Sequence, residues 1–283
     1  MFKTIHKLVW AFDAEWVPDP QAGRLLHHLP EETPDIEVMR AMWQQGGATE
    51  ENPQPYLKTI VCRLVSIAAV QRLQLPDGRV TLSLLSLPRD PHAEQHEKEL
   101  IQRFLGAIGE RKPQLVGYNS MAADLRILTQ RAICHGIQAA GFAHRPAKPW
   151  EGVDYFAKGG DWHIDLKEYA APGWGQGTPS LHELAVLSGI PGKMETSGEE
   201  VPQMWLDGQL DQIVRYNERD ALTTYLVWLR MAHFAGLLTA EQYPLEQQRT
   251  RELILKEAVA KPHLLDYLAA WETLSPAIRP PAD

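Results

Sequence analysis

A chain of 283 residues, 44% of them hydrophobic, can bury a substantial core, and we expect one large or two small folded domains. The formal net charge of -8 argues against a protein that coats nucleic acid through clustered Lys and Arg, but it does not exclude a nucleic-acid enzyme. The sequence lacks a leader-like start and a long apolar run, and Cys62 and Cys134 lie far apart. We therefore expect a cytoplasmic protein without disulfides or a cysteine zinc site.

The first predicted element is a buried strand that ends in two acids. The stretch Val9 to Trp16 is an apolar run that carries Asp13 and Glu15 near its end. Because strand side chains alternate, the two carboxylates should project from the same face, where they repel each other unless a cation lies between them. A frayed strand end with both acids in solvent is the alternative interpretation.

An excursion and a hairpin follow. Residues Asp19 to Pro55 are rich in Pro, Gly, Glu and His, and we interpret them as an insertion over an edge of the core, with one helix at Asp35–Gln45. The β-rich runs Val61–Leu73 and Arg79–Leu87 flank the turn Pro76-Asp77-Gly78, which predicts an antiparallel pair.

Helices and strands then alternate to the end of the chain. Two further strands are predicted at Gln114–Tyr118 and His163–Leu166, and helices at Ala93–Ile108, Met121–His135, Ser180–Ser188, Leu210–Ala235, Glu241–Ala260 and His263–Thr273. Asn119-Ser120 is the expected start of the second of these helices, whose buried face should include Leu128 and Ile133. The pattern predicts an α/β fold with a mixed central sheet, helices on both faces and three layers. We expect a domain at residues 1–235 and a helical extension at residues 236–283.

Three further residues complete a candidate site. Asp124 lies at the predicted strand-to-helix junction, and Tyr216 and Asp220 are four apart on one helical face. Each has a structural explanation of its own, a helix dipole for Asp124 and a solvated helix face for the pair. Together with Asp13 and Glu15 they make four carboxylates without a basic ligand, a set that suits Mg²⁺ or Mn²⁺. Paired metals of this kind can cleave phosphodiesters.

The combination Asp-x-Glu, Asn-x4-Asp and Tyr-x3-Asp resembles the DnaQ-like 3′-5′ exonucleases of the four-acid, tyrosine-containing (DEDDy) type. The sequence is most similar to the predicted exonucleases related to the proofreading domain of B-family DNA polymerases. The likeness covers roughly Val9 to Met231 and includes the segments Ser180–Ala185, Gly189–Lys193 and Asp220–Tyr225. This resemblance implies a ribonuclease H-like fold and two divalent cations, Mg²⁺ or Mn²⁺, as cofactors.

The resemblance also implies a role for each candidate residue. Asp13, Glu15 and Asp220 would hold the metal that activates water, and Asp13 would bridge to a second metal supported by Asp124. Tyr216 would orient the water by a hydrogen bond rather than act as a strong base, since a phenol has a pKa of about 10.

Three positions are expected to meet the substrate. Asn119 belongs to the second motif. Ala123 and Trp16 depart from the family pattern, which usually has Phe and Thr at these positions. The missing ring at Ala123 would widen the substrate pocket, and Trp16 would either stack on the terminal nucleotide or pack within the protein.

The expected activity is release of 5′-nucleotides from the 3′ end of single-stranded DNA. The same ligands would serve a 3′-5′ exoribonuclease, which would differ by its contacts to the 2′-OH. A catalytically silent nucleic-acid-binding or docking module is the alternative outside enzymes, and a proofreading role would need an unidentified protein partner.

Other candidates have simpler interpretations. The spacing of His92 and His96 does not match a helical zinc pair, because Glu97 follows both histidines instead of lying between them. Lys193 is interpreted as a loop residue, although it could touch a phosphate, and Asp165 as a structural acid. The tryptophans at 150, 162 and 174 could stack on bases, but anchoring of their loops explains them equally well.

Overall fold

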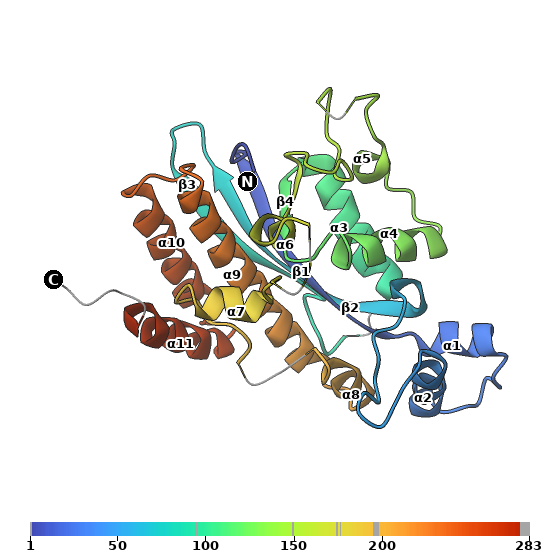
Figure 1. The fold of residues 1–283 in the computed structure, drawn as a ribbon. Coiled ribbons are helices and arrows are strands. Elements are labelled where there is room, and N and C mark those ends of the chain that lie inside the picture. Colours follow the sequence, from blue (N-terminus) through green and yellow to red (C-terminus); the bar gives the residue numbers. More distant parts are fainter. Residues whose placement is uncertain are drawn as a thin grey trace.

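A five-stranded mixed sheet forms the centre of the computed structural model, which describes residues 2–93, 96–148, 150–173, 175, 177–194 and 198–277 (Figure 1). The strands are β1 (Leu8–Pro18), β2 (Cys62–Gln74), β3 (Val80–Leu87), β4 (Gln114–Gly117) and β5 (His163–Asp165), in the order β3-β2-β1-β4-β5. β1 runs antiparallel to β2 and parallel to β4. The strand order and the mixed sheet confirm the predicted α/β, ribonuclease H-like fold.

Helices cover both faces of this sheet, so the three predicted layers are confirmed (Figure 1). One face carries α7 (Leu181–Val186), α9 (Leu210–Phe234), α10 (Gln242–Glu257) and α11 (His263–Ala277). The other face carries α3 (Glu97–Arg111), α4 (Asp124–Cys134) and α5 (Ala140–Ala143). The short helices α6 (Leu166–Ala170) and α8 (Val201–Leu206) lie in the connections.

β1 is buried on both faces, and its side chains alternate between two hydrophobic clusters. Val9 and Ala11 pack on the side of α9, whereas Trp10, Phe12 and Ala14 pack on the side of α3 and α4. The alternation of strand side chains assigns the following odd-numbered positions to the α9 side. Those positions are the acids of the predicted site.

The insertion after β1 contains two helices rather than the single helix predicted. α2 spans Asp35–Gln45, as expected, and α1 spans Pro20–His27 before it. The Pro and Gly of this segment suggested a loop, but Pro20 occupies the first helical turn, where a missing N–H is tolerated. Gly23 permits close packing of the two helices, since a Cβ there would lie 2.4 Å from Cγ1 of Val38.

The predicted start of the helix after β4 was wrong. α4 begins at Asp124, and Asn119 does not cap it, because its backbone is left-handed with φ of 61°. The hydroxyl of Ser120 is instead 2.8 Å from Nε2 of the buried His163. Gly117 makes room for this contact, since a Cβ at that position would lie 2.4 Å from Cβ of Ser120. Ile133, expected on the buried face of α4, is 72% exposed.

A buried ion network fixes the end of β1 against the helices. Arg131 of α4 lies 2.6 Å from Glu97 of α3 and 2.7 Å from Asp19, the residue that follows β1. Glu97 also accepts a hydrogen bond from the backbone N–H of Leu64 in β2. This network therefore joins α3, α4 and two strands beside the candidate site.

The last two helices share the hydrophobic cluster of α9. Tyr267 and Trp271 of α11 are fully buried in it, and the hydroxyl groups of Tyr267 and Thr223 are 2.9 Å apart. Arg72 of β2 and Glu246 of α10 form a buried ion pair at 2.8 Å. In the described part of the chain, none of the helices combines the length and the apolar character that crossing a membrane requires.

Candidate metal centre

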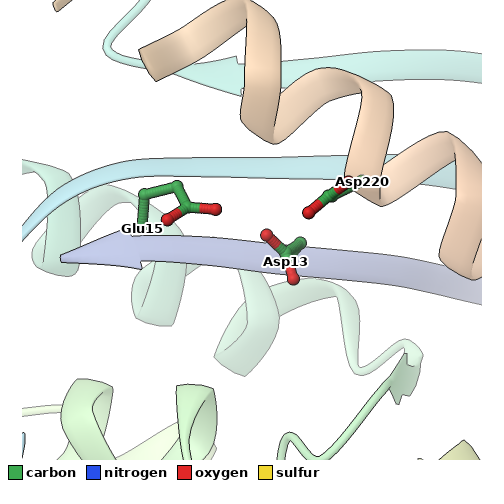
Figure 2. A group of neighbouring side chains, drawn as sticks. All are labelled: Asp13, Glu15 and Asp220. Atoms are coloured by element: carbon green, nitrogen blue, oxygen red, sulfur yellow. The ribbon is translucent and has the colours of Figure 1, made fainter. Parts of the chain in front are cut away.

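Three acids from two elements meet on the α9 side of the sheet. Asp13 and Glu15 project from β1 toward Asp220 of α9, as Figure 2 shows. One carboxylate oxygen from each residue lies within 4.8 Å of the other two. Among the described residues these three form the only group of possible metal ligands this close together. The arrangement agrees with the strand alternation that places Asp13 and Glu15 on one face.

A buried amide holds Asp13 in position. The Nδ2 group of Asn217, on α9, donates a hydrogen bond of 2.7 Å to Oδ2 of Asp13. The other end of this amide accepts a hydrogen bond of 3.2 Å from the hydroxyl of Ser66 in β2. Asn217 was not among the predicted site residues, although its spacing gave a signal: residues 217 and 220 are three apart and are therefore neighbours on the helix surface.

Asp124 contacts β1 at the edge that faces β4, opposite to the edge that pairs with β2. β1 pairs with β4 only through Val9, Trp10 and Ala11, so the edge beyond Ala11 has no neighbouring strand. There the backbone N–H of Ala14 donates a 3.0 Å hydrogen bond to Oδ1 of Asp124, which is only 4% exposed. Asp124 is not one of the three acids grouped above, but it lines the same cavity.

The four carboxyl groups hold their protons more tightly than isolated acids do. Burial is the largest cause for each, and it raises the pKa of Asp124 to about 7 and that of Asp220 to about 6. The pKa values of Asp13 and Glu15 lie well above their usual range, because charge repulsion within the cluster adds to burial. Such a cluster favours protons or cations near neutral pH. Its all-oxygen donor set fits Mg²⁺ or Mn²⁺.

The acids form the floor of a cavity of about 620 Å³. The predicted substrate residues Trp16, Asn119 and Ala123 line it, as does Tyr216. The insertion and its C-terminal flank contribute further lining residues that were not predicted from the sequence: Trp43, Asn52, Gln54, Pro55, Tyr56 and Leu57. The structure thus brings every predicted site residue to one cavity.

Lys193 is held at the rim of this cavity by its own loop. Its backbone N–H donates a 2.9 Å hydrogen bond to Nδ1 of His182, on α7. The preceding Gly192 permits that contact, since a Cβ there would lie 2.2 Å from the same nitrogen. The charge of Lys193 lowers the pKa values of Glu15 and Asp220 against their larger burial effects. Its proximity to both acids gives this loop lysine a direct electrostatic effect on the site.

The other described candidates, Asp165, Trp150 and Trp162, are not among the residues that line the cavity. Asp165 accepts hydrogen bonds from the backbone N–H groups of Asn119, Met121 and Lys167 at 2.8 to 3.1 Å, which agrees with the interpretation of a structural acid. Trp162 packs against the α3 side of the core, and Trp150 is 78% exposed. Trp174 lies outside the described residues.

Comparison with known proteins points to one family. The family model described as "Predicted 3'-5' exonuclease related to the exonuclease domain of PolB" matches residues 54–271. This range includes Asp124, Tyr216 and Asp220, whereas Asp13 and Glu15 precede it. No curated protein matches the chain significantly.

The chain is also similar to a solved structure, the family B DNA polymerase from the hyperthermophilic archaeon Pyrobaculum calidifontis. The two share 15% sequence identity with a TM-score of 0.44, over 90% of this chain and 29% of the polymerase chain. The chain therefore spans less than a third of that polymerase.

Proposed function

The chain belongs to the predicted 3′-5′ exonucleases related to the exonuclease domain of PolB, and from this premise we propose that it releases 5′-nucleotides from the 3′ end of single-stranded DNA. The family and the enzyme class expected from the sequence are confirmed by this membership. The observation that carries the proposed reaction is the convergence of Asp13, Glu15 and Asp220, with Asp124 on the same cavity.

The acids explain why the reaction would need cations. A phosphodiester strand is anionic, and the acidic floor of the cavity repels it unless positive charge lies between them. We propose that Asp13, Glu15 and Asp220 hold one divalent cation, and that Asp13 and Asp124 hold a second. When bound there, two such cations would activate a water molecule and offset the charge of the leaving oxygen. Asn217 would keep Asp13 oriented for both.

Tyr216 would act as a hydrogen-bonding residue. Burial, followed by the charge of Asp220, raises the pKa of its phenol far above the ordinary value, so the hydroxyl keeps its proton at neutral pH. A hydroxyl that stays protonated can orient a water molecule but cannot remove a proton from it. Lys193 would face the phosphate, and Trp16, Asn119 and Ala123 would contact the terminal nucleotide.

The broader organisation follows from the same proposal. Residues 1–235 would form the exonuclease domain, and residues 236–283 an extension that supports α9. A proofreading role would require an unidentified protein partner, and we propose a cytoplasmic location.

The test is nucleotide release from a 5′-labelled single-stranded oligonucleotide with Mg²⁺ or Mn²⁺. We expect a ladder that shortens from the 3′ end, and 5′-mononucleotides as products. Asp13→Asn should abolish release, whereas the control Asp77→Asn, on an exposed turn, should retain it. Equal release by the wild type and Asp13→Asn would refute the assignment. A matched RNA strand tests the alternative, because an exoribonuclease would degrade it faster.

A further inference from the structure

Tyr56 presents an open aromatic ring inside the cavity. It lines the same space as the four acids, yet 72% of its surface is exposed. The ring lies edge-to-face with that of Trp16, with centroids 6.4 Å apart and an interplanar angle of 87°. Trp16 also lines this cavity, so the aromatic pair and the four acids face the same space. An exposed ring of this kind offers a flat surface to a ligand.

The chain on either side holds Tyr56 in place. Pro55 precedes it and restricts the backbone. Leu57 follows and packs against two hydrophobic clusters. One lies on the sheet face that α3 and α4 cover, and the other lies around α2 and α8. Gly46 leaves space for Leu57, since a Cβ there would lie 2.5 Å from Cδ2 of that leucine. A ring anchored in this way loses little conformational freedom when a ligand binds.

The charged residues that line the cavity indicate which kind of contact would bind a single strand there. Among the lining residues that the structure describes, Lys193 is the only one with a positive charge. A basic groove of the kind that follows the backbone of single-stranded nucleic acid is therefore lacking in this lining. Stacking on aromatic rings is the other source of affinity for single strands, and every base has a face that can stack.

The location of Tyr56 fits such a role. It lines the cavity together with the four acids, and burial, followed by the charge of Asp124, raises its pKa to about 12. The phenol therefore keeps its proton at neutral pH and adds no negative charge beside the acids, while most of the residue's surface remains exposed. A base stacked on this ring would lie next to the point where its own phosphate meets the acids.

We propose that Tyr56, supported by Trp16, stacks on one of the last two bases of a single strand and so positions the 3′ end. This inference rests on the proposed function for the identity of the strand. According to this proposal, Tyr56, which directly follows the insertion, makes the protein specific for an unpaired 3′ end. A base-paired end would have to open before its base could reach the ring.

The experiment measures both nucleotide release with Mn²⁺ and strand binding by fluorescence anisotropy with Ca²⁺. Tyr56→Ala should lower kcat/KM and affinity by about 5- to 150-fold, the factor that corresponds to stacking of one base. Tyr56→Phe should recover most of this loss, because it keeps the ring. Trp150→Ala is the matched control, since this exposed ring is not among the lining residues, and it should behave as the wild type.

Abasic oligonucleotides separate stacking from a structural effect. Removing the base at the last or the penultimate position should weaken wild-type binding and abolish the difference between wild type and Tyr56→Ala. If the difference persists on both abasic strands, or if Tyr56→Ala binds as tightly as wild type, the stacking proposal is wrong. If the wild type binds the strand but releases no nucleotide, the proposed function fails while the binding data still decide the stacking proposal.

Discussion

Neutralising Asp124 should make the metal-free protein less sensitive to rising pH. Asp124→Asn keeps an oxygen that can accept the N–H of Ala14 but removes the buried charge. The pKa of Asp124 is raised from 3.8 to about 7 by folding, so the folded state binds more protons than the unfolded state between these values. The free energy of unfolding must therefore fall as pH rises through this window.

The size of the effect follows from the shift. A difference of about three pH units corresponds to a penalty of about 4 kcal/mol once Asp124 is ionised, at pH 8. At pH 5 the folded protein keeps this proton, and only about 2 kcal/mol of the penalty is present. The stability of the variant relative to the wild type should therefore rise by about 2–3 kcal/mol between pH 5 and pH 8. The test compares the stability difference at the two pH values rather than its absolute size, because burial of the new amide adds a cost that does not change with pH.

Urea denaturation in EDTA at the two pH values measures this change. The control is Asp77→Asn: hydrogen bonds from Arg79 lower the pKa of Asp77, so its carboxylate is ionised in both the folded and the unfolded protein between pH 5 and pH 8, and the difference from wild type should stay flat. Adding Mn²⁺ at pH 8 should stabilise the wild type more than Asp124→Asn. A relative stability of Asp124→Asn that does not change with pH would refute the electrostatic reasoning.

Three further substitutions test single contacts. Asn217→Ala removes the hydrogen bond that orients Asp13, and nucleotide release with Mn²⁺ should fall by about 10- to 100-fold, the usual cost of losing a residue that orients a metal ligand. Lys193→Met removes a cation that lowers the pKa of Glu15, so the acid limb of the pH–rate profile should move to higher pH. Arg131→Met removes the arginine that pairs with the buried carboxylates of Asp19 and Glu97, and it should cost about 3–5 kcal/mol of stability in urea denaturation. The first prediction is wrong if Asn217→Ala releases nucleotides as fast as the wild type. The second is wrong if Lys193→Met leaves the pH–rate profile unmoved, and the third if Arg131→Met is as stable as the wild type.

The sheet and its acids could be predicted because their pattern is local. The alternation along β1 separates Val9 and Ala11 from Trp10 and Phe12, and the same period places Asp13 and Glu15 together. Helical spacing likewise places Tyr216 and Asp220 on one face. A short sequence window contains all the information that these predictions require.

Contacts between distant segments escaped prediction because no local pattern encodes them. Asn119 resembled a helix cap, but the carboxylate of Asp165, 46 residues later, binds its backbone N–H and supports a left-handed turn. The helical spacing of Asn217 relates it to Asp220, but only the folded protein shows its amide between Asp13 and Ser66. Tyr56 follows the segment that was interpreted as an insertion over an edge of the core. Its place in the cavity depends on α2 and on Trp16.

The location of Asp124 explains how one site can hold four acids without unfolding the protein. If all four carboxylates projected from one face of the sheet, they would repel one another strongly, and no backbone N–H group would be available to offset the repulsion. Asp124 instead takes the backbone N–H that the short pairing of β1 with β4 leaves free, and Asn217 donates to Asp13 from the other side. Both hydrogen bonds favour the ionised form of their acids and partly offset the burial that opposes it. The polypeptide thus orients the ligands in advance, and the charge that remains uncompensated is the charge that divalent cations would neutralise.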